Sequence, residues 1–392
     1  MKLLIGKDTE SEDGVDIDTS KSHIILITGK RGSGKSYTLG VIAEELNLKS
    51  KEIIPIIIDS MGIYWTMAME NDQENLYEWN LSPQALPVRL LVPGNPKVIF
   101  DEELLTEMEY RGIDVTPIWI PPSDIEPDEW LDLFGFSLTD PMGIALYRAA
   151  STLYSRKIDE GYRFAMDDIV KEVTKDEYAH DRTKVALISR LDVAKRWGIF
   201  RDAVWKTLDL FHEGTINIID LSPLDPTRYG LRQFITMIIC KKLFAERLRA
   251  RRKEELGRLT DIPRIWLLID EAQHFIPSGK GTTSKPILIR WVKEGRQPGL
   301  SIVLSTQQPS ALDSEVLSQC DTIIAHRITM KMDIDALNAL SQDYMKLEFK
   351  QYLKKVKNPG QAIFLDDEKE RLNIVKVRGR VSRHGGREIT WT

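Results

Sequence analysis

The chain has 392 residues, of which 42% are hydrophobic and 29% charged, and its formal net charge is −5. This length can bury one large core or two smaller ones. The negative charge excludes a protein that binds nucleic acid through its average field, so such binding would need a local basic patch or a pore. Cys240 and Cys320 are the only cysteines, and they predict a reducing compartment without a disulfide framework. Without a secretory signal or an apolar run of roughly 18 to 20 residues, we expect a cytoplasmic protein with no membrane contact.

The first elements in the chain predict a short β segment followed by a β-α-β unit. Residues 1–20 hold two apolar stretches around an acidic turn, which indicates a small hairpin. The stretch HIILITGKRGSGKSYTLGVIAEEL then gives an apolar run, a glycine-rich bend and helical apolar spacing. A second apolar run, 53–58, ends at Asp59. Together they predict a parallel sheet that is buried on both faces.

The middle of the chain differs from its flanks. Within residues 71–200, proline clusters alternate with long amphipathic stretches and few strand candidates are present. We expect a mostly helical insertion there, between two parts of one core at 21–70 and 201–392. The later part predicts a long helix, a closing hairpin with a basic tail, and strands at 216–221, 265–269, 301–305 and 322–325.

The most specific motif is a phosphate-binding loop. Residues 29–36 read GKRGSGKS and match G-x-x-x-x-G-K-[ST] between an apolar run and a helix. The glycines let backbone N–H groups face the β- and γ-phosphates, Lys35 adds a positive charge, and the Ser36 hydroxyl reaches Mg²⁺. We therefore expect ATP and Mg²⁺ as cofactors. The expected nucleotide-binding residues are Gly29, Lys30, Arg31, Gly32, Ser33, Gly34, Lys35, Ser36 and Tyr37.

Polar side chains follow three of the apolar runs. In IWLLIDEAQ, we expect Asp270 to hold Mg²⁺ through water and Glu271 to orient and deprotonate the attacking water. A surface turn would also explain this acid pair, but the glycine loop favours catalysis. Gln307 either senses the γ-phosphate and positions the water, or is a capping or turn residue. Asp59 either contacts metal or water, or belongs to a strand-end turn.

These parts predict an α/β ATPase of the additional-strand P-loop type, also seen in RecA, with a central, mainly parallel sheet. Such sites commonly take an arginine finger from a neighbouring subunit. Arg296, before the strand that leads to Gln307, and Arg327, after the next strand, are the two candidates. Because strands begin at the edge opposite the ligand-binding crevice, Arg296 is expected to point away from its own phosphates.

For three basic segments, the sequence does not decide whether they contact a nucleic acid. Residues 246–258 are either a solvated helix end or a nucleic-acid contact. The glycine-rich tail 376–387 has the same two interpretations and is expected to be mobile. The loop 277–286, which contains Lys280 and Lys285, could face a central pore.

Taken together, the motifs resemble the HerA/FtsK branch of ATPases, and HerA-like proteins most closely. The resemblance implies a hexameric double-stranded DNA translocase, often paired with a NurA-type nuclease in DNA end processing. It also implies that Lys35 and Ser36 bind nucleotide and Mg²⁺, that Glu271 is catalytic, that Gln307 is a sensor, and that Arg296 is a finger candidate. It is weak through 71–200 and is carried by HIILITGKRGSGKS, DSMGIYW, LLIDEAQHFIP, EGRQPGLSIVLSTQQPSALDSEVLSQCDTIIAHR and RVSRHGG.

The sequence departs from that family in two places. Many HerA proteins carry an N-terminal β-barrel that serves assembly and nuclease docking, whereas only about twenty residues precede His23 here. This departure puts the nuclease partner in doubt. The family often has a glutamate where this chain has Ile63, which weakens a catalytic interpretation of the Asp59 region.

Two classes of function fit these observations. One is an ATP-driven DNA translocase ring, which the 277–286 loop and the basic tail favour. The other is an ATP-dependent ring that acts on a protein partner in assembly, defence or secretion, which the acidic net charge favours. Stimulation of the ATPase by double-stranded DNA would distinguish them. A monomeric NTPase is a third possibility, and the apparent need for a finger argues against it.

Overall fold

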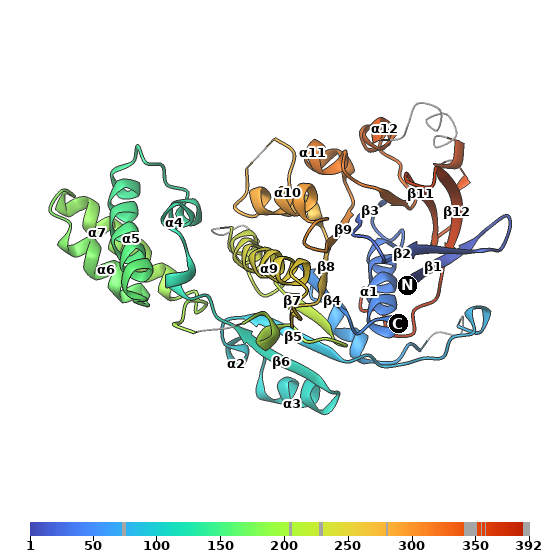
Figure 1. Ribbon diagram of the computed structural model, residues 1–392, viewed down its shortest axis with the longest axis horizontal. Helices are drawn as coiled ribbons and strands as arrows, with labels where there is room; N and C mark the ends of the chain where they lie inside the picture. Colours follow the sequence, from blue (N-terminus) through green and yellow to red (C-terminus); the bar gives the residue numbers. More distant parts are fainter. Residues whose placement is uncertain are drawn as a thin grey trace, which may run out of the picture.

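The computed structural model describes residues 1–72, 76–203, 206–226, 230–279, 281–340, 351–353, 355–356 and 358–386. They form one mixed sheet with helices on both faces (Figure 1). The strands are β1 (Lys2–Asp8), β2 (Gly14–Asp18), β3 (Ile24–Thr28), β4 (Ile53–Asp59), β5 (Val88–Pro93), β6 (Ile113–Ile118), β7 (Ile216–Asp220), β8 (Arg264–Ile269), β9 (Leu300–Thr306), β10 (Thr322–Ala325), β11 (Gln361–Asp366) and β12 (Arg371–Val377). The helices are α1 (Lys35–Lys49), α2 (Pro96–Ile99), α3 (Glu102–Tyr110), α4 (Pro127–Phe134), α5 (Pro141–Glu160), α6 (Met166–Lys175), α7 (Asp181–Lys195), α8 (Thr207–Leu210), α9 (Leu231–Glu255), α10 (Lys285–Glu294), α11 (Ser314–Leu317) and α12 (Lys331–Leu340).

The strand order is β2-β1-β12-β11-β10-β3-β9-β8-β4-β7-β5-β6. The strands from β10 to β6 in this order pair in parallel, and the remaining pairs are antiparallel. β9 lies between β3 and β8, with Thr28 opposite Thr306 and Ile269 opposite Leu304. This inserted strand is the additional strand that the motifs predict, so the expected α/β, mainly parallel fold is confirmed.

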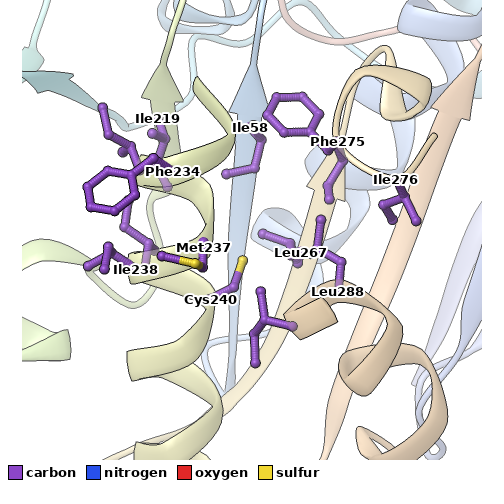
Figure 2. Packing of buried hydrophobic residues seen from close by; sticks show 14 of the residues in the cluster. Ile58, Ile219, Phe234, Met237, Ile238, Cys240, Leu267, Phe275, Ile276 and Leu288 are labelled. Atoms are coloured by element: carbon purple, nitrogen blue, oxygen red, sulfur yellow. The ribbon is translucent and has the colours of Figure 1, made fainter. Parts of the chain in front are cut away.

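Helices cover both faces of the parallel strands, which explains their nearly continuous apolar sequences. α1 packs on one face together with the inward side chains of β3 and β4. α9 and α10 pack on the other, where Phe234 and Cys240 of α9 meet Ile58 of β4 and Leu267 of β8 (Figure 2). The P-loop helix is therefore held against the sheet by buried apolar surface.

The region 71–200, which the sequence predicts to be a mostly helical insertion, also contains two strands of the central sheet. Helices α4 to α7 group at one end of the molecule, away from most of the sheet (Figure 1). However, β5 pairs in parallel with β7, and β6 pairs in parallel with β5, so both strands extend the central sheet. The expectation overlooked them because prolines flank or interrupt both strands, and proline normally argues against a strand. The limits 71 and 200 remain a prediction.

Two hairpins, one near each end of the described chain, form the antiparallel end of the same sheet. The N-terminal hairpin β1–β2 pairs with β12, which belongs to the closing hairpin β11–β12. A Cβ on Gly6 would lie 2.1 Å from the Lys376 carbonyl oxygen, so glycine permits the close approach of β1 and β12. In the part of the chain that the structure describes, no helix combines the length and apolar character needed to cross a membrane.

Candidate nucleotide site

The P-loop connects the carboxyl end of β3 to the first turn of α1. Gly29, Gly32 and Gly34 have φ values of 153°, 72° and 113°, which other residues rarely adopt. A Cβ on Gly29 would lie 2.5 Å from the Ser33 hydroxyl and 2.7 Å from Cβ of His326. The motif glycines therefore allow a tight bend that presents the helix N-terminus, a favourable position for phosphate.

Lys35 is buried at the base of this loop. Its Nζ donates a hydrogen bond to the Lys30 carbonyl oxygen at 3.3 Å. Burial lowers the pKa of Lys35, and the nearby carboxylates of Glu271 and Asp270 oppose this shift. The ammonium group thus lies within the electrostatic reach of the acid pair.

Asp270, directly after β8, is the centre of a buried hydrogen-bond network. It accepts hydrogen bonds from the hydroxyls of Ser36 at 2.9 Å, Tyr64 at 3.0 Å and Ser305 at 2.8 Å. Burial raises its pKa, as does the neighbouring charge of Glu271, while the three hydroxyl donors lower it. Sequence reasoning missed Tyr64 and Ser305. The signal for Ser305 was its polar side chain near the end of a mostly apolar strand.

The Ser36 hydroxyl and the Asp270 carboxylate have the chemistry to hold Mg²⁺. Hard oxygen donors suit this ion, which usually shares few protein ligands with the substrate phosphates. Among the residues that the structure describes, no group of three or more His, Cys, Asp or Glu side chains is placed to hold a metal. The two oxygen donors fit an ion that is also bound by substrate phosphates.

Glu271 has a left-handed backbone, with φ of 54°, which is uncommon for a residue with a side chain. Its carboxylate accepts hydrogen bonds from the side-chain amides of Gln307 and of Gln273, the latter at 2.7 Å. Gln273 in turn accepts a 2.7 Å hydrogen bond from the Thr306 hydroxyl. The structure thus brings Gln307 to Glu271 and adds Gln273, which sequence reasoning missed.

His326, directly after β10, was also missed. Its Nδ1 lies 2.9 Å from the Gln361 carbonyl oxygen and its Nε2 lies 2.9 Å from the Thr38 hydroxyl. Because a carbonyl only accepts, Nδ1 carries the hydrogen and Nε2 accepts from Thr38. Burial lowers the pKa of His326 to about 4. A neutral imidazole therefore links α1 to β11.

Asp59 has the geometry of a strand-end turn. Its carboxylate accepts hydrogen bonds from the backbone N–H groups of Met61, Gly62, Ile63 and Tyr64, at 2.8 to 3.0 Å. Burial, together with the charges of Asp220 and Asp270, raises its pKa to about 7. Of the two interpretations, the structure favours the turn, which places Tyr64 beside Asp270.

The two finger candidates occupy opposite edges of the sheet. The Arg327 carbonyl oxygen accepts a 2.9 Å hydrogen bond from the Lys30 N–H, so this residue lies beside its own P-loop with an exposed side chain. Arg296 is exposed at the opposite edge, where it borders a shallow depression of about 310 Å³ with Arg251 and Arg264. The structure therefore does not bring Arg296 to its own nucleotide site.

A cleft of about 760 Å³ joins the predicted residues at the carboxyl edge of the sheet. Lys35, Ser36, Asp270, Glu271 and Gln307 all line this cleft. The cleft also extends over residues that were not expected to bind nucleotide, among them Trp79, Gly360 and His384. Its size and its convergent polar groups suit a nucleotide.

The expectation of a mobile basic tail was wrong for the described residues. Arg378 and Arg380 are fully buried and form ion pairs with Glu44 of α1, at 2.9 and 3.2 Å. Arg378 also forms an ion pair with Glu45 at 3.1 Å, so both arginines are paired with carboxylates inside the protein. Residue 387, at the end of the predicted tail, lies outside the described residues.

The other two basic segments also contain paired charges. Lys285 forms a 2.8 Å ion pair with Asp313, and Lys280 lies outside the described residues. In the 246–258 segment, Arg247 is buried and paired with Glu254 at 3.0 Å. These contacts remove Lys285 and Arg247 from the set of charges available to a nucleic acid.

A P-loop beside an additional strand, with an acid pair on the next strand, defines a P-loop ATPase with a RecA-like core. The chain belongs to the HerA helicase central-domain family, whose model matches residues 3–243. The zonular occludens toxin (Zot) family model matches residues 234–367. The HerA-like resemblance of the motifs is therefore confirmed.

Curated relatives come from archaea. The chain is 25% identical to a probable helicase of Methanocaldococcus jannaschii, over 99% of this chain and 69% of the relative. It is 29% identical to the DNA double-strand break repair helicase HerA of Pyrococcus furiosus, over 45% of this chain and 36% of the relative. It is 23% identical to the DNA double-strand break repair helicase HerA of Sulfurisphaera tokodaii, over 84% of this chain and 58% of the relative. The matches thus span less than two thirds of these two HerA proteins.

Solved structures show the same fold. VirB4 of Thermoanaerobacter pseudethanolicus has a TM-score of 0.63 at 15% identity, with 96% of both chains covered. The plasmid coupling protein TrwB, in complex with a non-hydrolysable ATP analogue, has a TM-score of 0.55 at 14% identity, with 99% of this chain and 97% of TrwB covered. Both likenesses concern the architecture of the core.

Proposed function

We propose that the protein is an ATP-hydrolysing motor that forms a hexameric ring and translocates double-stranded DNA. The observation that carries the proposal is the position of Glu271, which lines the same cleft as Lys35 and Ser36 and is hydrogen-bonded to Gln307. A carboxylate beside the expected γ-phosphate position is what hydrolysis by water requires.

Nucleotide binding is assigned to the P-loop. Its backbone N–H groups and Lys35 would hold the phosphates, and Ser36 with Asp270 would hold Mg²⁺, which when bound neutralises charge on the phosphate oxygens. Tyr64 and Ser305 fix the Asp270 carboxylate through their hydroxyls. These contacts orient the acid before nucleotide arrives.

Hydrolysis is assigned to Glu271. The carboxylate would accept a proton from a water molecule while the oxygen of that water forms a bond to the γ-phosphorus. At the same time, the bond between the γ-phosphorus and the β–γ bridging oxygen would break. Gln307 and Gln273 restrict the carboxylate to the cleft. Gln307 is hydrogen-bonded to Glu271 and also lines the cleft. It would therefore link the presence of a γ-phosphate to the position of the Glu271 carboxylate.

The position of Arg296 supports the proposed ring. This exposed arginine lies at the amino edge of the parallel strands and the cleft lies at the carboxyl edge. If the amino edge of one protomer's sheet faces the carboxyl edge of its neighbour's sheet in a ring, Arg296 would reach the phosphates bound by that neighbour. This arrangement would make hydrolysis depend on assembly.

DNA as the substrate rests on the HerA family and on its relatives' names, which describe repair helicases. The same likeness would place the motor in DNA end processing, with a NurA-type nuclease as a possible partner. The buried Arg378 and Arg380 and the paired Lys285 favour a second candidate, a ring that acts on a protein partner. The basic surface expected for DNA is smaller than the sequence indicates.

The experiment that tests DNA translocation is ATPase turnover with and without double-stranded DNA at low salt, with the ring verified by mass. We expect turnover to rise with DNA, and DNA binding to weaken as salt increases, because its contacts would be mainly to phosphates. Flat turnover over all DNA concentrations in an assembled ring would favour the protein-partner function.

A further inference from the structure

The carboxylate of Glu44, in the middle of α1, is fully buried and holds the segment that follows β12. Besides Arg378 and Arg380, it accepts hydrogen bonds from the backbone N–H groups of Val381 and Ser382, at 3.1 and 3.0 Å. The Ser382 hydroxyl donates a further hydrogen bond at 2.6 Å. One side chain of the P-loop helix therefore fixes several consecutive residues near the end of the described chain.

The same segment is fixed at the beginning of α1. The Arg380 N–H donates a 2.7 Å hydrogen bond to the Tyr37 hydroxyl, and the guanidinium crosses α1 at Gly40. A Cβ on Gly40 would lie 2.5 Å from an Arg380 nitrogen, so glycine permits this approach. Figure 1 shows the red segment after β12 passing beside α1.

This arrangement makes the segment a wall of the nucleotide cleft. Gly379, His384 and Gly386 line the cleft together with Tyr37. The rings of Tyr37 and His384 meet edge to face, with centroids 5.5 Å apart and planes at 78°. Arg380 donates a 3.3 Å hydrogen bond to Nδ1 of His384, which fixes the imidazole in this position.

The direction of a bound nucleotide follows from the two ends of the cleft. Glu271 and Gln307 mark the γ-phosphate end, and the P-loop N–H groups occupy the middle. Tyr37 directly follows Ser36, so the part of the nucleotide beyond its α-phosphate has to pass Tyr37 and the segment beside it. That part is the ribose and the base.

We propose that Tyr37, His384 and the backbone of residues 379–386 form the subsite for the ribose and aromatic base of the nucleotide. Glu44 is the positioning residue that holds this wall against α1. Aromatic rings and close backbone suit a flat base, which gains by stacking and by hydrogen bonds to its edge. The inference rests on the proposed ATP site, because the base position is defined relative to the phosphates.

The test compares two ligands on the full chain by calorimetry: ATP, and inorganic tripolyphosphate, which has phosphates but neither ribose nor base. His384→Ala should weaken ATP binding about tenfold and change tripolyphosphate binding less than twofold, because the imidazole is proposed to contact the base and not the phosphates. Gly386→Val, which adds a side chain beside the His384 ring, should have the same selective effect. His180→Ala, an exposed histidine before α7, is the matched control and should leave both affinities unchanged.

The outcomes separate this inference from the proposed function. If the wild-type chain bound neither ligand, the ATP site itself would be wrong. If it bound both, but His384→Ala and Gly386→Val weakened the two ligands equally or neither of them, the wall would be only structural and the inference would be overturned. Circular dichroism of each variant verifies that it is folded.

Discussion

The hydroxyl of Ser36 donates a 2.9 Å hydrogen bond to the carboxylate of Asp270 and so joins the first turn of α1 to the end of β8. The two residues are 234 positions apart in the chain. Their meeting depends on β9, which separates β3 from β8 and sets the width of the cleft. The site is therefore a property of the sheet order as well as of the P-loop.

Replacing Lys35 with alanine should abolish hydrolysis and weaken ATP binding. The change removes the buried positive charge expected at the β- and γ-phosphates, and electrostatic groups of this kind typically supply roughly 10²-fold or more in turnover. ATPase assays and titration with a fluorescent ATP analogue would measure both effects. Lys51→Ala, an exposed lysine before β4, is the control. Wild-type turnover in Lys35→Ala would contradict the assignment.

Replacing Glu271 with glutamine should separate binding from chemistry. The shape and the neighbouring Gln307 and Gln273 are retained while the base is lost, so ATP should still bind and turnover should fall by about 10²- to 10⁴-fold. Equilibrium binding and single-turnover hydrolysis are the two measurements. A variant that bound ATP poorly, yet hydrolysed the bound fraction at the normal rate, would show that Glu271 does not activate water.

Burial of a neutral His326 should make stability depend on pH. Its folded pKa of about 4 is below the ordinary value of 6.5, so between these values the unfolded chain binds more protons. Its contribution to stability is therefore complete above pH 6.5 and falls as the pH drops towards 4. At pH 5 the loss should be about 2 kcal/mol relative to pH 7.

The measurement is urea unfolding of wild type and of His326→Gln at pH 7 and pH 5. Glutamine keeps a donor and an acceptor but does not titrate, and the shifts of all other groups cancel in the comparison. The wild type should lose more stability than the variant on acidification. Equal losses would show that folding does not lower the pKa of His326.

Local sequence patterns predicted the residues of the candidate site. Features that depend on contacts between distant parts of the chain could not be predicted. The GKRGSGKS motif and the strand-end pair Asp270 and Glu271 are readable because their spacing is local. The burial of Arg378 is not, because its partner Glu44 is 334 residues away and the local sequence looks like a solvated basic tail. The role of His326 could not be predicted either, because its partner Thr38 is 288 residues away in the chain. Strand β5 was missed because proline masked a fully buried run.

Arg296 should act on a neighbour's site. The residue lies at the edge of the sheet opposite its own cleft, so an Arg296→Ala ring should bind ATP normally. Loss of a finger typically costs about 10³- to 10⁵-fold in turnover for GTPases, which sets the expected scale. Arg249→Ala, an exposed arginine of α9, serves as the matched control. ATP binding and ATPase rates of the assembled variants measure both expectations.

Subunit mixing then distinguishes action on the neighbour from action on the arginine's own site. Arg296→Ala and Glu271→Gln subunits should each be nearly inactive alone. In a mixed ring, some interfaces join the intact Glu271 of an Arg296→Ala subunit to the intact Arg296 of a Glu271→Gln neighbour, and these should hydrolyse ATP. Activity should therefore pass through a maximum as the mixing ratio varies. If no mixture exceeded both parents despite verified co-assembly, Arg296 would serve its own protomer or no site, and Arg327, whose backbone contacts the P-loop, would be the next arginine to replace.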